Sequence, residues 1–146
     1  MGQNKLNATS SQKKTPMILK AQQGDSLSSG KLTLYAFDDT DHPVGCVELY
    51  NYDPINRRAA VGIVVSNEYR HKGLGTAMVQ TLTSFCQNNT SLHQIYADIA
   101  ATNTPSLHIF QKAGYRHCAT LRDWVLRSDR FIDTLRYQLI LEPSAL

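Results

Sequence analysis

The stretch VVSNEYRHKGLGTAMVQ, residues 64–80, contains three successive structural signals. It opens with the end of an apolar run at 57–66, RRAAVGIVVS, whose continuous apolar character is typical of a strand covered on both faces. A polar turn follows, and from Leu74 apolar residues recur at helical spacing, which predicts a helix to about Asn88. The stretch therefore predicts a buried strand, a turn that contains two glycines and an amphipathic helix, in that order.

The turn between this strand and this helix has the features of an anion site. A helix that begins directly after a strand points its free N–H groups and the positive end of its dipole at whatever lies beyond the strand. Gly73 and Gly75 would let a phosphate approach the backbone, and Arg70 and Lys72 add positive charge. The Walker loop is absent, and the dinucleotide fingerprint would need a third glycine where this chain has Met78. Taken alone, the string is also compatible with a plain glycine turn whose basic side chains are solvated.

The composition predicts an ordinary soluble, intracellular protein. The chain has 146 residues, 18% of them charged, and its net charge of +3 is too small and dispersed for a nucleic-acid-binding surface. Its apolar runs are too short to span a membrane. The three cysteines lack metal-ligand spacing, so we expect core thiols, no metal and a cytoplasmic location. We expect residues 1–16 to be a disordered polar leader and residues 17–146 to form a single domain.

The order of the expected elements is β-β-β-β-α-β-α-β-β, which predicts the α/β (α+β) class. Asn103 is expected to cap the second helix, which ends at Gly114. The last two strands form a hairpin that turns near Ser128 and Asp129. The expected strands lie at 17–22, 31–37, 43–52, 57–66, 94–101, 115–127 and 131–141.

A second motif, NTPSLHIFQKAGY at 103–115, follows the strand after the glycine turn. Together with RHKGLGT at 70–76, and in the same order and spacing, it resembles the two motifs of the GNAT superfamily of acetyl-coenzyme-A-dependent N-acetyltransferases. The resemblance covers residues 44–141, and by topology it extends back to about residue 17. Within the superfamily the chain is most similar to the bacterial spermidine and ribosomal-protein N-terminal acetyltransferase branch. It implies a mixed, mostly antiparallel sheet of about seven strands, splayed between strands four and five, with helices packed on its faces.

The resemblance also implies a binding site for acetyl-coenzyme A as co-substrate. The backbone that would pair with the pantetheine arm belongs to Ile63, Val64 and Val65. The residues that would cradle the pyrophosphate are Arg70, His71, Lys72, Gly73, Leu74, Gly75 and Thr76. The residues that would line the thioester end are Asn103, Ser106 and Phe110.

The chain departs from the spermidine acetyltransferases at positions that concern the acceptor and the proton transfer. The polyamine enzymes carry extra helices before the second strand, and acidic residues where this chain has Asn51 and Ala60, so only Glu48 matches. A polycation needs carboxylates to replace its water, which makes spermidine a doubtful acceptor. The tyrosine that similar enzymes use as general acid is Phe110 here, and a phenyl ring cannot donate a proton.

Glu48 and Tyr115 are the candidates for a general base that acts through water. Each has a structural alternative: Glu48 as a solvated strand carboxylate, and Tyr115 as a core residue at the start of a strand. His108 lies on the other side of its helix from Phe110 and is expected to be a surface or packing residue.

The sequence predicts an N-acetyltransferase that moves an acetyl group to a primary amine, on a small molecule or a protein N-terminus, by direct attack on the thioester. A backbone N–H of Val64 or Val65 would polarise the carbonyl. The alternative is an acyl-coenzyme-A-binding module with weak or no transfer activity and a regulatory or scaffolding role, which Phe110 favours. The last hairpin, with Trp124 and Tyr137, has an edge strand, so a homodimer is a hypothesis. We expect neither nucleic acid nor membrane as a partner.

Overall fold

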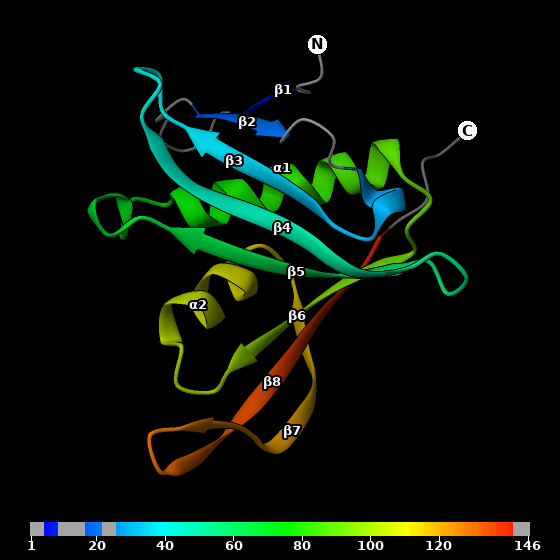
Figure 1. Ribbon diagram of the computed structural model, residues 1–146, viewed down its shortest axis with the longest axis vertical. Coiled ribbons are helices and arrows are strands. Elements are labelled where there is room, and N and C mark those ends of the chain that lie inside the picture. The colour runs from blue at the N-terminus through cyan, green and yellow to red at the C-terminus, as the bar shows by residue number, and fades with distance from the viewer. Residues whose placement is uncertain (1–4, 9–16, 22–25, 142–146) are drawn as a thin grey trace.

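The computed structural model describes residues 5–8, 17–21 and 26–141, and within these ranges one sheet holds eight strands (Figure 1). Their order across the sheet is β1-β2-β3-β4-β5-β6-β8-β7. The strands are β1 (Lys5–Ala8), β2 (Met17–Ala21), β3 (Leu32–Phe37), β4 (Pro43–Asp53), β5 (Arg58–Val65), β6 (Gln94–Ala100), β7 (Arg116–Arg127) and β8 (Arg130–Ile140). The helices are α1 (Leu74–Asn89) and α2 (Thr104–Lys112), with short 3₁₀ turns η1 (Leu27–Ser29) and η2 (Asn67–Tyr69).

The seven strands and two helices expected from the sequence all form, and β1 adds a strand that the sequence did not predict. Lys5–Ala8 pairs antiparallel with Met17–Lys20 of β2, so the expectation of disorder is wrong for these four residues. Strand pairing at a sheet edge rests on backbone hydrogen bonds, which need no apolar periodicity in the sequence. The rest of the expected leader, residues 1–4 and 9–16, lies outside the described residues.

The sheet opens into a V between β5 and β6, as the resemblance implied. These two strands are parallel and pair only from Arg58 to Ala60. Beyond that point β5 stays paired with β4 as far as Val65, while β6 stays paired with β8 as far as Ala100. Figure 1 shows the two strands diverging from their paired ends. The edge of β5 from 61 to 65 that faces β6 therefore has no strand partner among the described residues.

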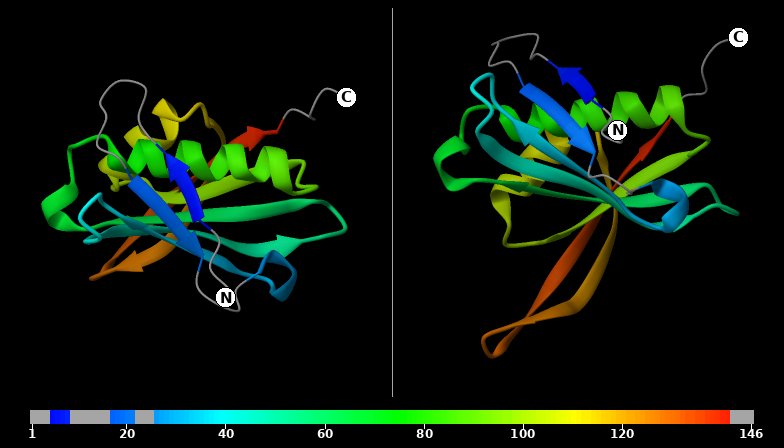
Figure 2. Two further views of the ribbon diagram at one scale, coloured as in Figure 1. Left: turned by 90° about the horizontal axis from the view of Figure 1, so that it is seen from above. Right: turned by 45° about the horizontal axis from the view of Figure 1, so that its top comes forward.

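Both helices pack against the same face of the sheet (Figure 2). Buried side chains of α1 and α2 join those of the strands in one core, which includes Leu34, Leu49, Val61, Met78, Leu82, Ile95 and Phe110. The alternating residues of the same strands, among them Tyr35, Tyr50 and Tyr96, point to the other face. No described helix covers that second face, which is called the open face below.

The described residues contain no helix with the length and apolar character that crossing a membrane requires. The expectation of core thiols holds for Cys86, where burial raises the pKa to about 12. It fails for Cys118, which is exposed where a bulge interrupts the pairing of β7 with β8.

Candidate functional site

The loop from Ser66 to Gly73 carries the chain from the end of β5 to the start of α1. Gly73 is the residue before the helix and has a left-handed backbone, with φ of 78°. His71 is also left-handed, with φ of 64°. No side chain caps this end of α1. The first-turn N–H groups therefore keep their hydrogen-bonding capacity for an anion, as the sequence predicted.

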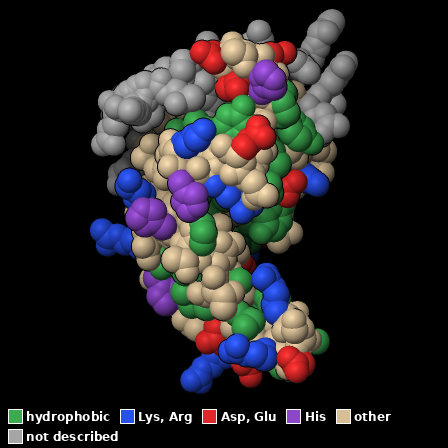
Figure 3. Space-filling model, turned by 90° about the vertical axis from the view of Figure 1, so that its left-hand side faces the viewer, with side chains coloured by type: hydrophobic (Ala, Val, Ile, Leu, Met, Phe, Trp, Pro, Cys, Tyr) green, Lys and Arg blue, Asp and Glu red, His purple; other side chains and the backbone are tan. Residues whose placement is uncertain are grey.

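The basic residues of this loop are exposed, and Arg70 also stabilises the loop. Nε of Arg70 donates to the carbonyl of Val65 at 3.1 Å, which ties the loop to the end of β5. The terminal nitrogens of Arg70 can still donate to a phosphate. Nζ of Lys72 lies 5.5 Å from the ring centroid of Tyr69. Figure 3 shows lysine, arginine and histidine side chains spread over this side of the molecule, with acidic side chains among them.

The two glycines of the loop have different roles. A Cβ on Gly73 would meet open space, so this position can receive a ligand. Gly75 is buried, and a Cβ there would lie 2.5 Å from Cδ1 of Ile109 and 3.4 Å from Cγ2 of Val65. Gly75 thus has a packing role that the sequence did not predict, because its missing side chain lets α2 pack against α1 and the end of β5. A contact of its backbone with phosphate stays a prediction.

The strand edge that would pair with a pantetheine arm lies directly beside this loop. Val64 points to the open face and is 60% exposed, whereas Ile63 and Val65 pack toward the core. Backbone N–H and C=O groups alternate between the two edges of a strand. Some of the backbone N–H and C=O groups of residues 61–65 therefore face the V and can form hydrogen bonds with an extended ligand.

The start of α2 is capped as predicted. Oδ1 of Asn103 accepts a hydrogen bond from the backbone N–H of Ser106 at 3.3 Å. The amide nitrogen of Asn103 is still available to a ligand, since the side chain is exposed. Contacts of Asn103 and of the half-buried Ser106 with the thioester end of the coenzyme stay predictions.

Phe110 and Tyr115 lie in the core, which contradicts the expected catalytic role of Tyr115. Phe110 is 1% exposed, and its ring packs edge-on against Tyr115 with centroids 5.0 Å apart. The hydroxyl of Thr83 donates to the carbonyl of Val79, so the Tyr115 hydroxyl donates to Thr83 Oγ1, at 3.0 Å. Burial raises the pKa of Tyr115 far above its ordinary value. Tyr115 is therefore a packing residue, not a general base. A contact of Phe110 with the thioester end of the coenzyme stays a prediction.

Replacing Tyr115 with phenylalanine tests this assignment. We expect the free energy of unfolding to fall by about 1 kcal/mol, because one internal hydrogen bond is lost while the ring stays packed. Any acetyl transfer should keep its kcat within about twofold, since a general base typically contributes at least a hundredfold. Urea unfolding and steady-state kinetics measure the two effects. A hundredfold fall in kcat without loss of stability would restore Tyr115 as a catalytic candidate.

Glu48 lies on the open face, next to the region where β5 and β6 separate. It stands opposite Gly62 of β5, and its side chain is 32% exposed. Nζ of Lys31 lies 3.2 Å from its carboxylate, and Thr33 donates to the same oxygen at 3.3 Å. The two base candidates are thus on opposite faces of the sheet, and only Glu48 stays a prediction.

The open face also holds a polar cluster that the sequence did not reveal. Arg136 forms two hydrogen bonds with Asp98, of 2.7 and 2.9 Å, and its guanidinium carbon lies 4.5 Å from the ring centroid of Tyr96. These residues come from β6 and β8, which are paired in register but are 38 residues apart in sequence. No local spacing signals such a cross-strand pair.

Comparisons with known proteins agree with this geometry. Residues 6–115 match the model of the acetyltransferase (GNAT) family. An uncharacterized N-acetyltransferase p20 of Bacillus licheniformis is 26% identical over 107 residues, 73% of this chain and 60% of that protein. The spermidine N(1)-acetyltransferase of Vibrio cholerae is 24% identical over 97 residues, 66% of this chain and 56% of that enzyme. This chain therefore spans little more than half the length of these relatives.

A crystal structure of the Vibrio cholerae spermidine N-acetyltransferase in complex with CoA and spermine has the same fold. Its TM-score is 0.73 at 21% identity, over 77% of this chain and 67% of that one. The similarity extends the agreement from sequence motifs to the arrangement of strands and helices.

Proposed function

Because the chain belongs to the acetyltransferase (GNAT) family, we propose that it transfers an acetyl group from acetyl-coenzyme A to a primary amine. One observation carries the proposal: the edge of β5 at 61–65, which has no strand partner among the described residues, leads through the loop at 66–73 to the uncapped start of α1. An extended arm that ends in a pyrophosphate fits this juxtaposition, because the edge offers strand-type hydrogen bonds and the helix start offers N–H donors.

The residues present fit such a ligand. The exposed Arg70, His71 and Lys72 surround the start of α1, and Gly73 leaves the space above it open. Acetyl-coenzyme A would supply the acetyl group as an activated thioester. The backbone of Val64 and Val65 would hold its arm and orient its carbonyl. Asn103 caps the start of α2, which is the second helix start near the V besides that of α1.

The acceptor would approach from the open face. On the other face, α1 and α2 meet at Gly75 and Ile109, and Phe110 fills the core between the helices and the sheet. The two carboxylates described beside the V on the open face both have cationic partners, Lys31 for Glu48 and Arg136 for Asp98. A polyamine would have to displace these partners. We therefore propose an acceptor with a single primary amine, a small molecule or a protein N-terminus.

The rival function is a module that binds acyl-coenzyme A with little or no transfer. The observation that favours it is Phe110, which leaves a buried phenyl ring where similar enzymes have an acidic hydroxyl. Both functions share the coenzyme site, so only a measurement of turnover separates them.

The test combines calorimetric binding of coenzyme A with a thiol-release assay on amines, amino acids, peptides with free N-termini and polyamines. We expect micromolar binding and turnover on single amines or peptide N-termini, with spermidine a poor acceptor. N-terminally blocked copies of the same peptides are the matched control. Binding without turnover on any acceptor would favour the module, and the absence of binding would refute both functions.

Two further expectations remain predictions. One is a cytoplasmic location. The other is a homodimer through the β7–β8 hairpin, which projects from the sheet in Figure 1 and exposes Trp124, Leu126 and Phe131 by 62%, 59% and 59%. Tyr137 does not take part in this surface, because it is buried and accepts a hydrogen bond from Gln111 at 2.9 Å.

A further inference from the structure

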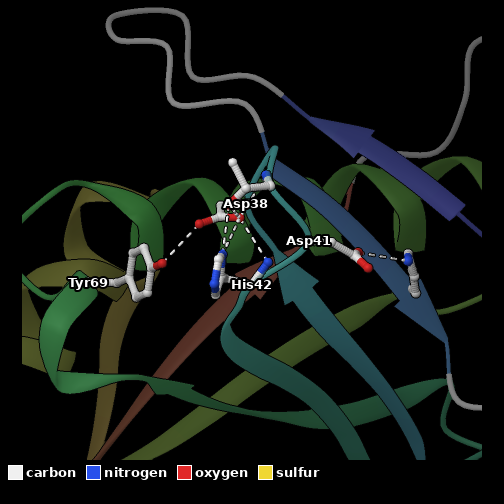
Figure 4. Close-up of polar contacts among 6 residues, drawn as sticks. Asp38, Asp41, His42 and Tyr69 are labelled. Carbon is white, nitrogen blue, oxygen red and sulfur yellow. Dashed lines mark hydrogen bonds and ion pairs between the residues drawn. The ribbon is translucent and has the colours of Figure 1, made fainter.

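The turn between β3 and β4 contains an aspartate whose two carboxylate oxygens have separate partners. Oδ1 of Asp38 accepts three hydrogen bonds from within the turn: from the N–H and hydroxyl of Thr40, at 2.9 and 2.8 Å, and from the N–H of His42, at 2.9 Å. Oδ2 accepts a hydrogen bond at 2.9 Å from the hydroxyl of Tyr69 (Figure 4). One oxygen thus builds the turn, and the other reaches a residue 31 positions away.

Tyr69 stands at the entrance of the glycine loop. It ends η2, directly before Arg70, which is tied to β5 through the carbonyl of Val65. The face of its ring carries Nζ of Lys72, at 5.5 Å from the centroid. A cation over an aromatic ring is attracted to it, which restricts a side chain that otherwise has many conformers. The β3–β4 turn therefore fixes the hydroxyl of Tyr69, and the ring of Tyr69 in turn positions Lys72 of the glycine loop.

The charges along this chain of contacts are compatible with an anion nearby. The Asp38 side chain is only 13% exposed. The N–H of His42 first, with Thr40 and the Tyr69 hydroxyl, holds the pKa of Asp38 well below its ordinary range, against the opposing effect of burial. The hydrogen bond from Tyr69 to Asp38 raises the pKa of Tyr69, so the tyrosine hydroxyl stays a donor. Because hydrogen-bond donors surround the carboxylate, its negative charge is largely compensated before a phosphate binds.

We propose that Asp38 and Tyr69 are positioning residues for phosphate binding, which act by holding Lys72 in place. The proposal rests on the coenzyme site proposed above. It assigns to the β3–β4 turn a part in ligand affinity, although that turn lies outside the glycine loop. Lys72 would contact the phosphate, whereas Tyr69 and Asp38 would act only through it.

The decisive variant is Tyr69→Phe, which keeps an aromatic ring but removes the hydrogen bond to Asp38 that fixes this ring, and with it Lys72, in place. We expect the Kd of coenzyme A to rise about fivefold, the scale set by restoring freedom to one long side chain. Asp38→Asn should have an effect at least as large. The matched control is Asp53→Asn, at the end of β4, where Asp53 likewise accepts hydrogen bonds from N–H groups of the following turn, those of Ile55 and Asn56. This control should leave the Kd unchanged.

A double-mutant cycle with Lys72→Ala separates positioning from a general loss of structure. If Tyr69 acts through Lys72, Tyr69→Phe should change the Kd less than twofold when Lys72 is already alanine. The salt dependence of the Kd should also fall in Tyr69→Phe and in Lys72→Ala, because each variant weakens one phosphate contact. Additive effects, or a Kd unchanged by Tyr69→Phe in a wild-type background that binds coenzyme A, would overturn this inference. Failure of the wild-type protein to bind coenzyme A would instead refute the proposed function.

Discussion

Replacing Gly73 with aspartate should weaken the binding of coenzyme A by more than about 100-fold, because two like charges a few ångströms apart at a protein surface repel by several kcal/mol. The fold should tolerate the change. The φ of 78° is one that aspartate and asparagine adopt more readily than other side chains, and a Cβ at this position meets open space. The new carboxylate would then stand at the uncapped start of α1. Isothermal titration calorimetry measures the loss directly.

Gly73→Asn is the matched control, because asparagine has nearly the same shape and backbone preference without the charge. We expect it to weaken coenzyme A binding by less than about tenfold, through partial occupation of the same space. Circular dichroism should show both variants folded. If Gly73→Asp bound coenzyme A as tightly as Gly73→Asn, the phosphates would not lie at this helix terminus.

Replacing Gly75 with valine should lower the free energy of unfolding by about 2–3 kcal/mol, the usual cost of overpacking a core position. The reason is local: a side chain here enters the space of Ile109 and Val65, so α2 has to move away from α1. Urea unfolding provides the measurement. Gly75→Ala should cost less, since the δ-methyl of Ile109 can rotate away and alanine is the better helix former.

The partner substitution Ile109→Val tests the same contact from the other side. It removes the methyl group that lies 2.5 Å from the Cβ position of residue 75, so Gly75→Ala should cost less in this background than in the wild type. Coenzyme A affinity of folded Gly75→Ala should stay within about threefold of wild type, the range left by small shifts of the helix start. A stable Gly75→Ala protein that had lost coenzyme A binding would show that phosphate access is the role of this glycine.

Those features of the fold that depend on neighbouring residues were predictable from the sequence. The run at 57–66, the glycine turn and the periodic apolar residues of α1 are contiguous, so one stretch contains the strand, the loop and the helix start. The cap at Asn103 and the turn before β8 were predictable for the same reason. Local hydrogen-bonding preferences and side-chain periodicity decide these features before any tertiary contact forms.

Features that depend on contacts between distant segments were not predictable. Helical spacing places Asn103, Ser106 and Phe110 on one side of α2, but it does not show that Tyr115 would cover the ring of Phe110. The need for glycine at 75 comes from Ile109, on a different helix. The Asp38–Tyr69 hydrogen bond joins two polar turn residues of ordinary type, so only their proximity in the folded chain distinguishes them.

In the proposed function, coenzyme A lies along the edge of β5 that faces the V and ends at the start of α1. At 16.3 kDa the protein suits amide mapping by two-dimensional ¹H–¹⁵N NMR during a titration with coenzyme A. We expect the amide signals of residues 61–65 and 73–76 to shift together and to saturate at one Kd, while those of the β7–β8 hairpin tip at 124–131 stay in place. Saturating shifts confined to the hairpin or to the open face of β3, with residues 73–76 unaffected, would contradict this placement of coenzyme A.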